Sequence, residues 1–162
     1  MKTHNLNRFL LNAQTQKDQK MGRNLLGRKN ILDLNILVCV DRSSSISESQ
    51  RVQFFCQIDK IRGLSRIKVL ETDSEVSAFY DYFKVNHSRV VRIGRGDATE
   101  FSKAFSFAKK LKPDVILFLT DSQVAEGSVV KDPGIPVGWI LTSTAHYPPY
   151  SFGEVIVQLP PV

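Results

Sequence analysis

The sequence has little of what disulfide-stabilised proteins and zinc enzymes need. It contains two cysteines and three histidines in 162 residues. There is no HExxH motif and no second histidine at metal-ligand spacing, which argues against zinc-dependent hydrolysis. Cys39 and Cys56 lie in strand-like and helix-like sequence, so each is expected to be a small buried side chain rather than half of a disulfide.

Long hydrophobic runs are also missing. No apolar stretch approaches the roughly 20 residues that a membrane-spanning helix needs. The first residues contain only short apolar pieces within polar sequence, unlike a secretory signal peptide. These features favour a cytoplasmic protein that does not span a membrane, and they give no reason to expect a membrane as its partner.

Charge is distributed unevenly along the chain. Residues 1–34 contain seven basic residues against Asp18 and Asp33, which gives +5 of the formal net charge of +6. We interpret residues 1–33 as a basic N-terminal arm and residues 34–162 as the folded domain. The basic residues of the arm are Lys2, Arg8, Lys17, Lys20, Arg23, Arg28 and Lys29.

Such an arm can bind nucleic acid, an acidic protein surface or lipid headgroups. A solvated tail without a partner is the alternative interpretation. The arm has no recognisable nucleic-acid-binding motif, and Phe9 is its only aromatic residue.

Apolar strand-like segments alternate with amphipathic helical segments after residue 34. This order predicts an α/β fold with a mostly parallel central sheet and helices on both faces. A tight turn after residue 73 predicts one hairpin. The expected strands are residues 36–40, 66–73, 75–83, 89–93, 114–121, 136–141 and 154–159, and the expected helices are residues 47–62 and 99–111.

Oxygen-bearing side chains gather where the central strands end. Parallel α/β sheets bind ligands at the carboxyl ends of their strands, beside the point where the strand order reverses. Two acids each end an apolar strand, two serines follow the first of them, and a threonine begins a helix. Hard divalent cations such as Mg²⁺ take oxygen ligands of this kind, so a metal site is predicted. Its residues are Asp41, Ser43, Ser45, Thr99 and Asp121.

Each of these residues also has a purely structural interpretation. Serine and aspartate after a strand commonly form turns and helix caps, and Thr99 alone would serve as a helix N-cap. The combination of all five, in this order on one edge of one sheet, favours the metal site.

The same residues resemble the metal-ion-dependent adhesion site (MIDAS) of von Willebrand factor A (VWA) domains. DRSSS, ATEF and LTD are similar to its DxSxS motif, threonine and aspartate. In particular, the chain resembles the VWA-like domain that follows a metallopeptidase-like module in bacterial cytosolic proteins. VDRSSSIS, TDSEV, GRGDATEF, PDVILFLTD, GWILT and FGEVI occur in the same order as there, over residues 34–159. The chain has no counterpart of that module, so the resemblance gives no reason to expect a protease.

The resemblance implies a Rossmann-like three-layer VWA fold and a binding function. Ser43, Ser45 and Thr99 would ligate Mg²⁺, or Mn²⁺ or Ca²⁺, and Asp41 and Asp121 would hold it directly or through water. Neutral hydroxyls leave the cation under-neutralised, so it attracts an acidic group of a protein partner. VWA-like proteins of this kind often associate with AAA+ ATPases, which makes such an ATPase a candidate partner.

Three positions depart from the family pattern. Ser44 stands where the family has the glycine of SGS, Asp97 and Ala98 replace glycines before the threonine, and Ser122 replaces the glycine of TDG. Asp97 is a candidate additional ligand that would cap the site from within the chain. The metal site would then be degenerate.

Two other functions remain open. In one, the chain is a structural or assembly protein, for example of a phage particle, in which the fold is a scaffold and the basic arm makes the contacts. In the other, it is an enzyme, which we do not expect. No histidine is placed to activate Ser43 or Ser45, and no glycine-rich phosphate loop followed by lysine occurs.

Overall fold

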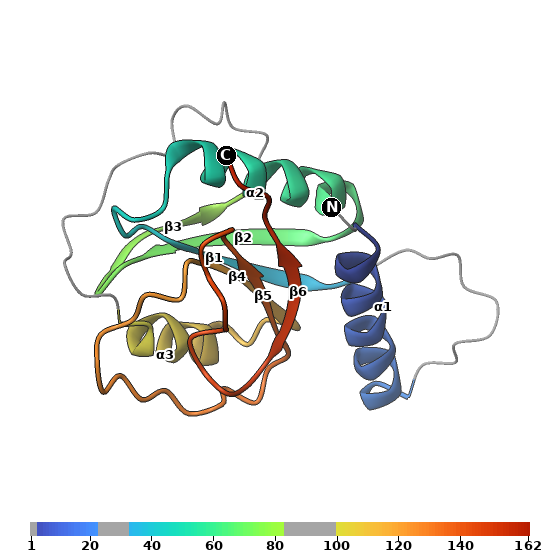
Figure 1. Cartoon of the computed structure of the whole chain (residues 1–162). Coiled ribbons are helices and arrows are strands. Elements are labelled where there is room, and N and C mark those ends of the chain that lie inside the picture. The colour runs from blue at the N-terminus through green and yellow to red at the C-terminus, as the bar shows by residue number, and fades with distance from the viewer. Residues whose placement is uncertain (1–2, 23–32, 83–99) are drawn as a thin grey trace.

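The computed structural model describes residues 3–22, 33–82 and 100–162 (Figure 1). It confirms the predicted fold class, a Rossmann-like α/β fold with a mostly parallel sheet between helices. The strand expected at residues 89–93 lies outside the described residues, as do Asp97, Thr99 and four basic residues of the expected arm. Those four are Lys2, Arg23, Arg28 and Lys29. No described helix is long and apolar enough to cross a membrane.

Six strands form one sheet in the order β3-β2-β1-β4-β5-β6. β2 and β3 pair antiparallel, as the predicted hairpin requires, and all other pairs are parallel. The chain passes from β1 outward through β2 to β3 and then returns to β4 on the other side of β1, so the strand order reverses between β1 and β4. The strands are β1 (Asn35–Asp41), β2 (Arg66–Thr72), β3 (Val76–Asp81), β4 (Val115–Thr120), β5 (Val137–Leu141) and β6 (Glu154–Gln158), and the helices are α1 (Thr3–Lys20), α2 (Glu48–Ile61), the 3₁₀ turn η1 (Arg62–Leu64) and α3 (Ser102–Leu111).

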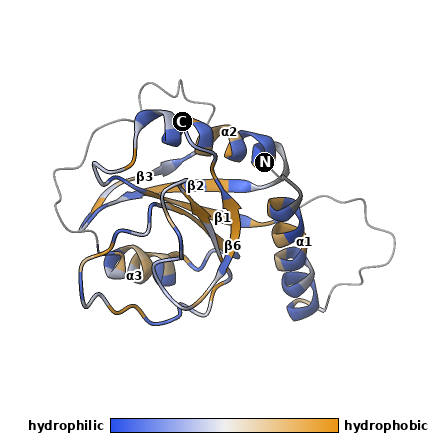
Figure 2. Ribbon diagram, in the orientation of Figure 1, coloured by the Kyte–Doolittle hydropathy of each residue, from blue (hydrophilic) through white to orange (hydrophobic). Residues whose placement is uncertain are grey.

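The central strands are covered on both faces, which explains their continuous apolar sequence. Ile36 and Val38 of β1 belong to a core shared with α1 and α2. Leu37 and Cys39, which point to the other face, belong to a core shared with α3. Figure 2 shows the apolar residues concentrated along these strands.

Helix α2 begins where the sequence predicts. The Ser47 hydroxyl accepts a hydrogen bond from the Gln50 N–H, and the Gln50 side chain accepts one from the Ser47 N–H, which is a capping box. Phe54, Phe55 and other apolar residues of α2 face the sheet. Cys56 lies on the outer face and is exposed, so the expectation that it is buried was wrong.

Residues 3–20 form a helix of the core, whereas the sequence favoured a basic arm over residues 1–33. Leu6, Phe9, Leu10 and Ala13 are buried in the same core as α2 and β6. Their i, i+3, i+4, i+7 spacing gives α1 one apolar face, and burying that face against the sheet stabilises a helix that its polar composition alone would not. In Figure 1, α1 stands beside β6.

Two glycines allow close packing against β5. A Cβ at Gly138 would lie 2.9 Å from Phe9 Cε1, so α1 approaches the sheet where a side chain is missing. Gly153 has a φ of +84°, and a Cβ there would lie 2.6 Å from Trp139 Nε1. Trp139 Nε1 in turn donates a hydrogen bond to the Phe152 carbonyl oxygen. The GWILT and FGEVI segments therefore pack against each other.

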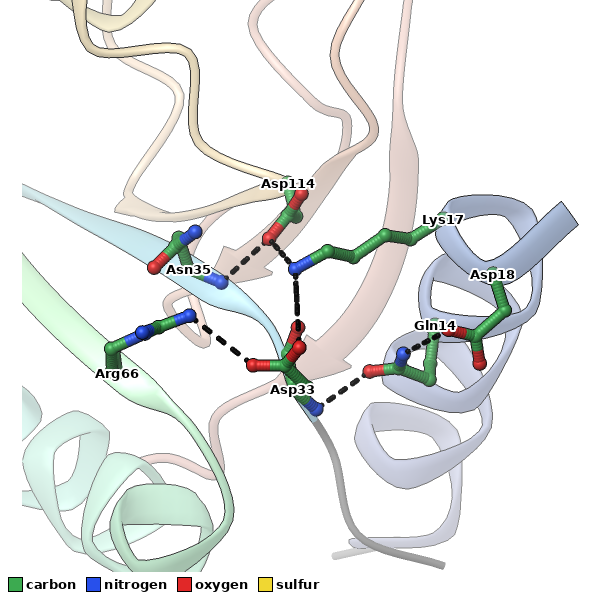
Figure 3. Close-up of polar contacts among 7 residues, drawn as sticks. All are labelled: Gln14, Lys17, Asp18, Asp33, Asn35, Arg66 and Asp114. Carbon is green, nitrogen blue, oxygen red and sulfur yellow. Dashed lines mark hydrogen bonds and ion pairs between the residues drawn. The ribbon is translucent and has the colours of Figure 1, made fainter. Parts of the chain in front are cut away.

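Polar contacts fix α1 to the amino ends of the central strands (Figure 3). Lys17 Nζ donates to Asp114 Oδ2 at 2.8 Å and also to the Asp33 carbonyl oxygen. The same Asp114 oxygen accepts the Asn35 N–H at 2.7 Å, and Gln14 Oε1 accepts the Asp33 N–H at 2.7 Å. Because the Lys17 side chain is 15% exposed, it is an internal cation of the fold rather than a free basic group of an arm.

Candidate metal centre

Asp41 and Asp121 lie at the carboxyl ends of adjacent parallel strands, as the sequence predicts. Asp41 is the last residue of β1, and Asp121 directly follows β4. β1 and β4 pair in parallel, with Val40 opposite Leu119, and the strand order reverses between them. Both acids are buried, with exposures of 0% and 4%. The structure therefore brings two carboxylates to the position where sheets of this type bind ligands.

Both carboxylate oxygens of Asp41 accept hydrogen bonds. Oδ1 accepts the Ser43 N–H at 2.9 Å, which forms an Asx turn and directs the loop away from β1. Oδ2 accepts the Thr120 hydroxyl at 3.0 Å, and the Thr120 oxygen accepts the Ser122 N–H at 3.0 Å. Thr120 therefore links the two loops of the site. It is not among the predicted ligands, although it is the threonine of the LTD segment.

Ser43 and Ser45 lie together in the loop after β1. Their hydroxyl oxygens are 3.0 Å apart, and Ser43 is buried while Ser45 is exposed. The pair therefore offers two neutral oxygens next to Asp41, with one of them open to solvent. Ser44 between them is exposed and does not have a positive φ, so replacing the family's glycine here causes no backbone strain.

Asp121 has one satisfied and one unsatisfied carboxylate oxygen. Oδ1 accepts the Gln123 N–H at 3.0 Å. Oδ2 is buried and has no hydrogen-bond partner among the described residues, and the Ser122 hydroxyl oxygen is in the same state. A buried oxygen without a partner costs free energy, and an ordered water or a cation can satisfy it. The Asp41 and Asp121 carboxylates and the Ser43 and Ser45 hydroxyls form a donor set that suits a hard cation, so these residues fit Mg²⁺.

The electrostatics also fit a cation. The pKa of Asp41 is raised to about 6, chiefly by burial and also by the negative charge of Asp121, against the hydrogen bonds from Ser43 and Thr120 that lower it. A divalent cation between the carboxylates would stabilise both charges and reverse this effect.

Two arginines stabilise the loop after β1. Arg51 of α2 donates from Nη2 to the Ser43 carbonyl oxygen at 3.1 Å, and burial lowers the pKa of its guanidinium. Arg42 Nε lies 3.4 Å from Glu71 Oε2, and the Tyr80 hydroxyl donates to Glu71 Oε1 at 2.8 Å. Because Arg51 reaches the loop only through the tertiary packing of α2, no sequence signal identifies it.

Ser122 has a left-handed backbone, with a φ of +66°. This is the position at which the family pattern has the glycine of TDG. The structure therefore keeps the backbone shape that the pattern implies, although a serine adopts it with strain.

The predicted ligand set is placed in part. Asp41, Ser43, Ser45 and Asp121 converge on one edge, whereas Thr99 lies outside the described residues. Within the described parts of the chain, no group of three or more His, Cys, Asp or Glu side chains lies together. A metal site here therefore depends on hydroxyl oxygens as well as on the two carboxylates.

Comparison with known families gives one result. A family model described as VWA-like domain (DUF2201) matches residues 36–159, which run from β1 to the residue after β6. No curated protein matches the chain.

Proposed function

The chain belongs to the VWA-like domain family, and from this premise we propose that it is a protein-interaction module whose contact with its partner depends on a divalent cation. Family membership itself indicates a protein-interaction module. The dependence on a cation goes beyond what family membership indicates. It is supported by the buried Asp121 Oδ2, which has no partner among the described residues, and by the Asp41 carboxylate and the Ser43 and Ser45 hydroxyls at the same end of the sheet.

The cation would be Mg²⁺, with Mn²⁺ or Ca²⁺ as substitutes. Asp41 and Asp121 would supply the negative charge, and Ser43, Ser45 and Thr99 would supply neutral oxygens. Because the hydroxyl ligands are neutral, a cation whose aspartates act through water would be under-neutralised by its direct ligands, so it would attract a carboxylate from outside the chain.

The partner is therefore expected to present an acidic side chain to this edge of the sheet. An AAA+ ATPase is a candidate, by resemblance to VWA-like proteins that associate with such ATPases. We also propose that the domain binds without catalysing a reaction. The Ser43 and Ser45 hydroxyls contact each other, and neither serine has a histidine among its hydrogen-bond partners in the described residues.

Two ion pairs weaken the alternative proposal, in which the chain is an assembly protein that binds through a basic arm. Arg8 pairs with Glu154 of β6 at 2.9 Å, and Lys17 pairs with Asp114. The described part of the expected arm is a core helix, so these two basic groups contact the protein's own strands and loops.

Affinity purification from cells that contain the gene tests the proposal. Wild-type protein in Mg²⁺ buffer should retain a partner that EDTA releases and that renewed Mg²⁺ restores. The double variant Ser43→Ala with Ser45→Ala should not retain it. Ser44→Ala, in the same loop but exposed and not a predicted ligand, is the matched control and should behave as wild type. A partner retained equally with EDTA would contradict cation-dependent binding.

A further inference from the structure

A cavity of about 450 Å³ lies at the edge of the sheet opposite the candidate metal centre. It is formed where the carboxyl ends of α1 and α3 meet the loops that lead into β4 and β5. Two helices that are far apart in the sequence therefore build one wall each. Its lining includes Lys17, Lys20, Met21, Lys109, Lys112 and Asp114.

The cavity is strongly basic. Among the described residues that line it, four are lysines and Asp114 is the one acid. Asp114 Oδ2 already accepts hydrogen bonds from Lys17 Nζ and the Asn35 N–H, so this negative charge is used within the fold. The other three lysines are exposed and make no ion pair or side-chain hydrogen bond with any described residue. Their charges are available to a ligand.

Helix electrostatics explain part of this arrangement. Lysines in the last turn of a helix interact favourably with its macrodipole, and Lys20 and Lys109 occupy such positions. That effect does not explain why both helices end at one concave surface. It also does not explain the apolar part of the wall, where Ile135 and Pro136 are half-buried and Met21 is 55% exposed.

From this geometry we propose that the cavity docks an acidic segment of a partner protein. Carboxylates spaced along an extended segment match lysines that reach the cavity on long flexible stems from α1 and α3. The apolar wall can contact the aliphatic parts of the same segment. The described lining therefore combines apolar side chains with several lysines, which suits a segment that carries both carboxylates and aliphatic groups.

A compact phosphate group fits less well. Phosphate sites commonly use backbone N–H groups at helix amino ends, and both helices here present their carboxyl ends. The Lys112 N–H, at the end of α3, already donates to the Ala108 carbonyl oxygen. Nucleic acid is disfavoured because the described lining of the cavity includes no aromatic side chain to stack on a base.

The experiment measures binding of a short fluorescein-labelled peptide of alternating Glu and Ala to the full chain, by fluorescence anisotropy at low salt. EDTA is present throughout, so the candidate metal centre cannot contribute and the two sites are tested separately. The double variant Lys20→Gln with Lys109→Gln removes two cavity lysines. Lys60→Gln with Lys110→Gln removes the same charge from exposed positions that do not line the cavity.

The peptide should bind wild type and the control variant alike, and the cavity variant should bind about tenfold more weakly. Three results would overturn the proposal. They are no saturable binding by wild type, equal weakening in both variants, and tighter binding of a single-stranded oligonucleotide or of triphosphate than of a peptide with the same charge.

Discussion

Asp41 is completely buried, and its carboxylate lies near a second buried carboxylate. Its pKa is raised from 3.8 to about 6, chiefly by burial. In the cation-free protein, the contribution of this group to stability is therefore full below about pH 4 and is lost as the pH rises through about 6.

Asp41→Asn should remove this pH dependence. The shift of the pKa corresponds to at most about 3 kcal/mol, so between pH 4 and pH 7 the unfolding free energy of wild type should fall relative to the variant by up to that amount. Urea denaturation in EDTA at a series of pH values measures it. Glu126→Gln, at an exposed acid, is the control. Parallel profiles for wild type and Asp41→Asn would contradict a raised pKa.

Ser122 carries two costs, a left-handed backbone and a buried hydroxyl oxygen without a partner among the described residues. Ser122→Gly should remove both and stabilise the protein by about 1 kcal/mol. Ser122→Ala removes only the hydroxyl and keeps the strained φ, so its gain should be smaller. Chemical denaturation in EDTA compares the unfolding free energies of wild type and the two variants. A glycine variant less stable than wild type would be inconsistent with strain at this position.

Two adjacent leucines of α1 differ in burial, which allows a direct test of whether the helix belongs to the core. Leu10 is fully buried, and Leu11 is 45% exposed. Leu10→Ala should lower the unfolding free energy by about 3 kcal/mol, whereas Leu11→Ala should change it by less than about 1 kcal/mol. Equal, small losses in both variants would indicate that α1 is not part of the core.

The elements that are easiest to predict are those whose sequence reflects burial alone. The apolar runs of β1 and β4 indicate central strands, and the acids that end them indicate a shared edge, which the structure confirms. Ser47 likewise indicates the start of α2.

Other features depend on contacts between distant segments. The helical spacing of Leu6, Phe9 and Leu10 is present in the sequence, but basic and amide residues around it favour an arm. The deciding contact is with Gly138, more than a hundred residues later, where a missing side chain makes room for Phe9. Arg51 is similar, because its role follows only from how α2 packs on the loop after β1.

The molecule as a whole presents two polar sites at opposite edges of one sheet. The central strands between them are seven and six residues long, which places the sites roughly 20 Å apart. Exposed charges at that distance are largely screened at physiological salt. In EDTA, binding of the acidic peptide at the basic cavity should therefore be the same, within about twofold, for wild type and for Asp41→Asn, which removes a charge from the candidate metal centre. Anisotropy titrations of the two proteins at equal ionic strength compare them, and a large difference would mean that the sites are coupled or are one.

The measurement that tests the candidate metal centre most directly is isothermal titration of the purified full chain with Mg²⁺ and Mn²⁺. Asp41→Asn keeps the size of the side chain and removes its charge, and Ser44→Ala is the matched loop control. Saturable binding by wild type and by Ser44→Ala, with none by Asp41→Asn, is the expected result. No binding by wild type, or unchanged binding by Asp41→Asn, would contradict a cation site formed by these residues.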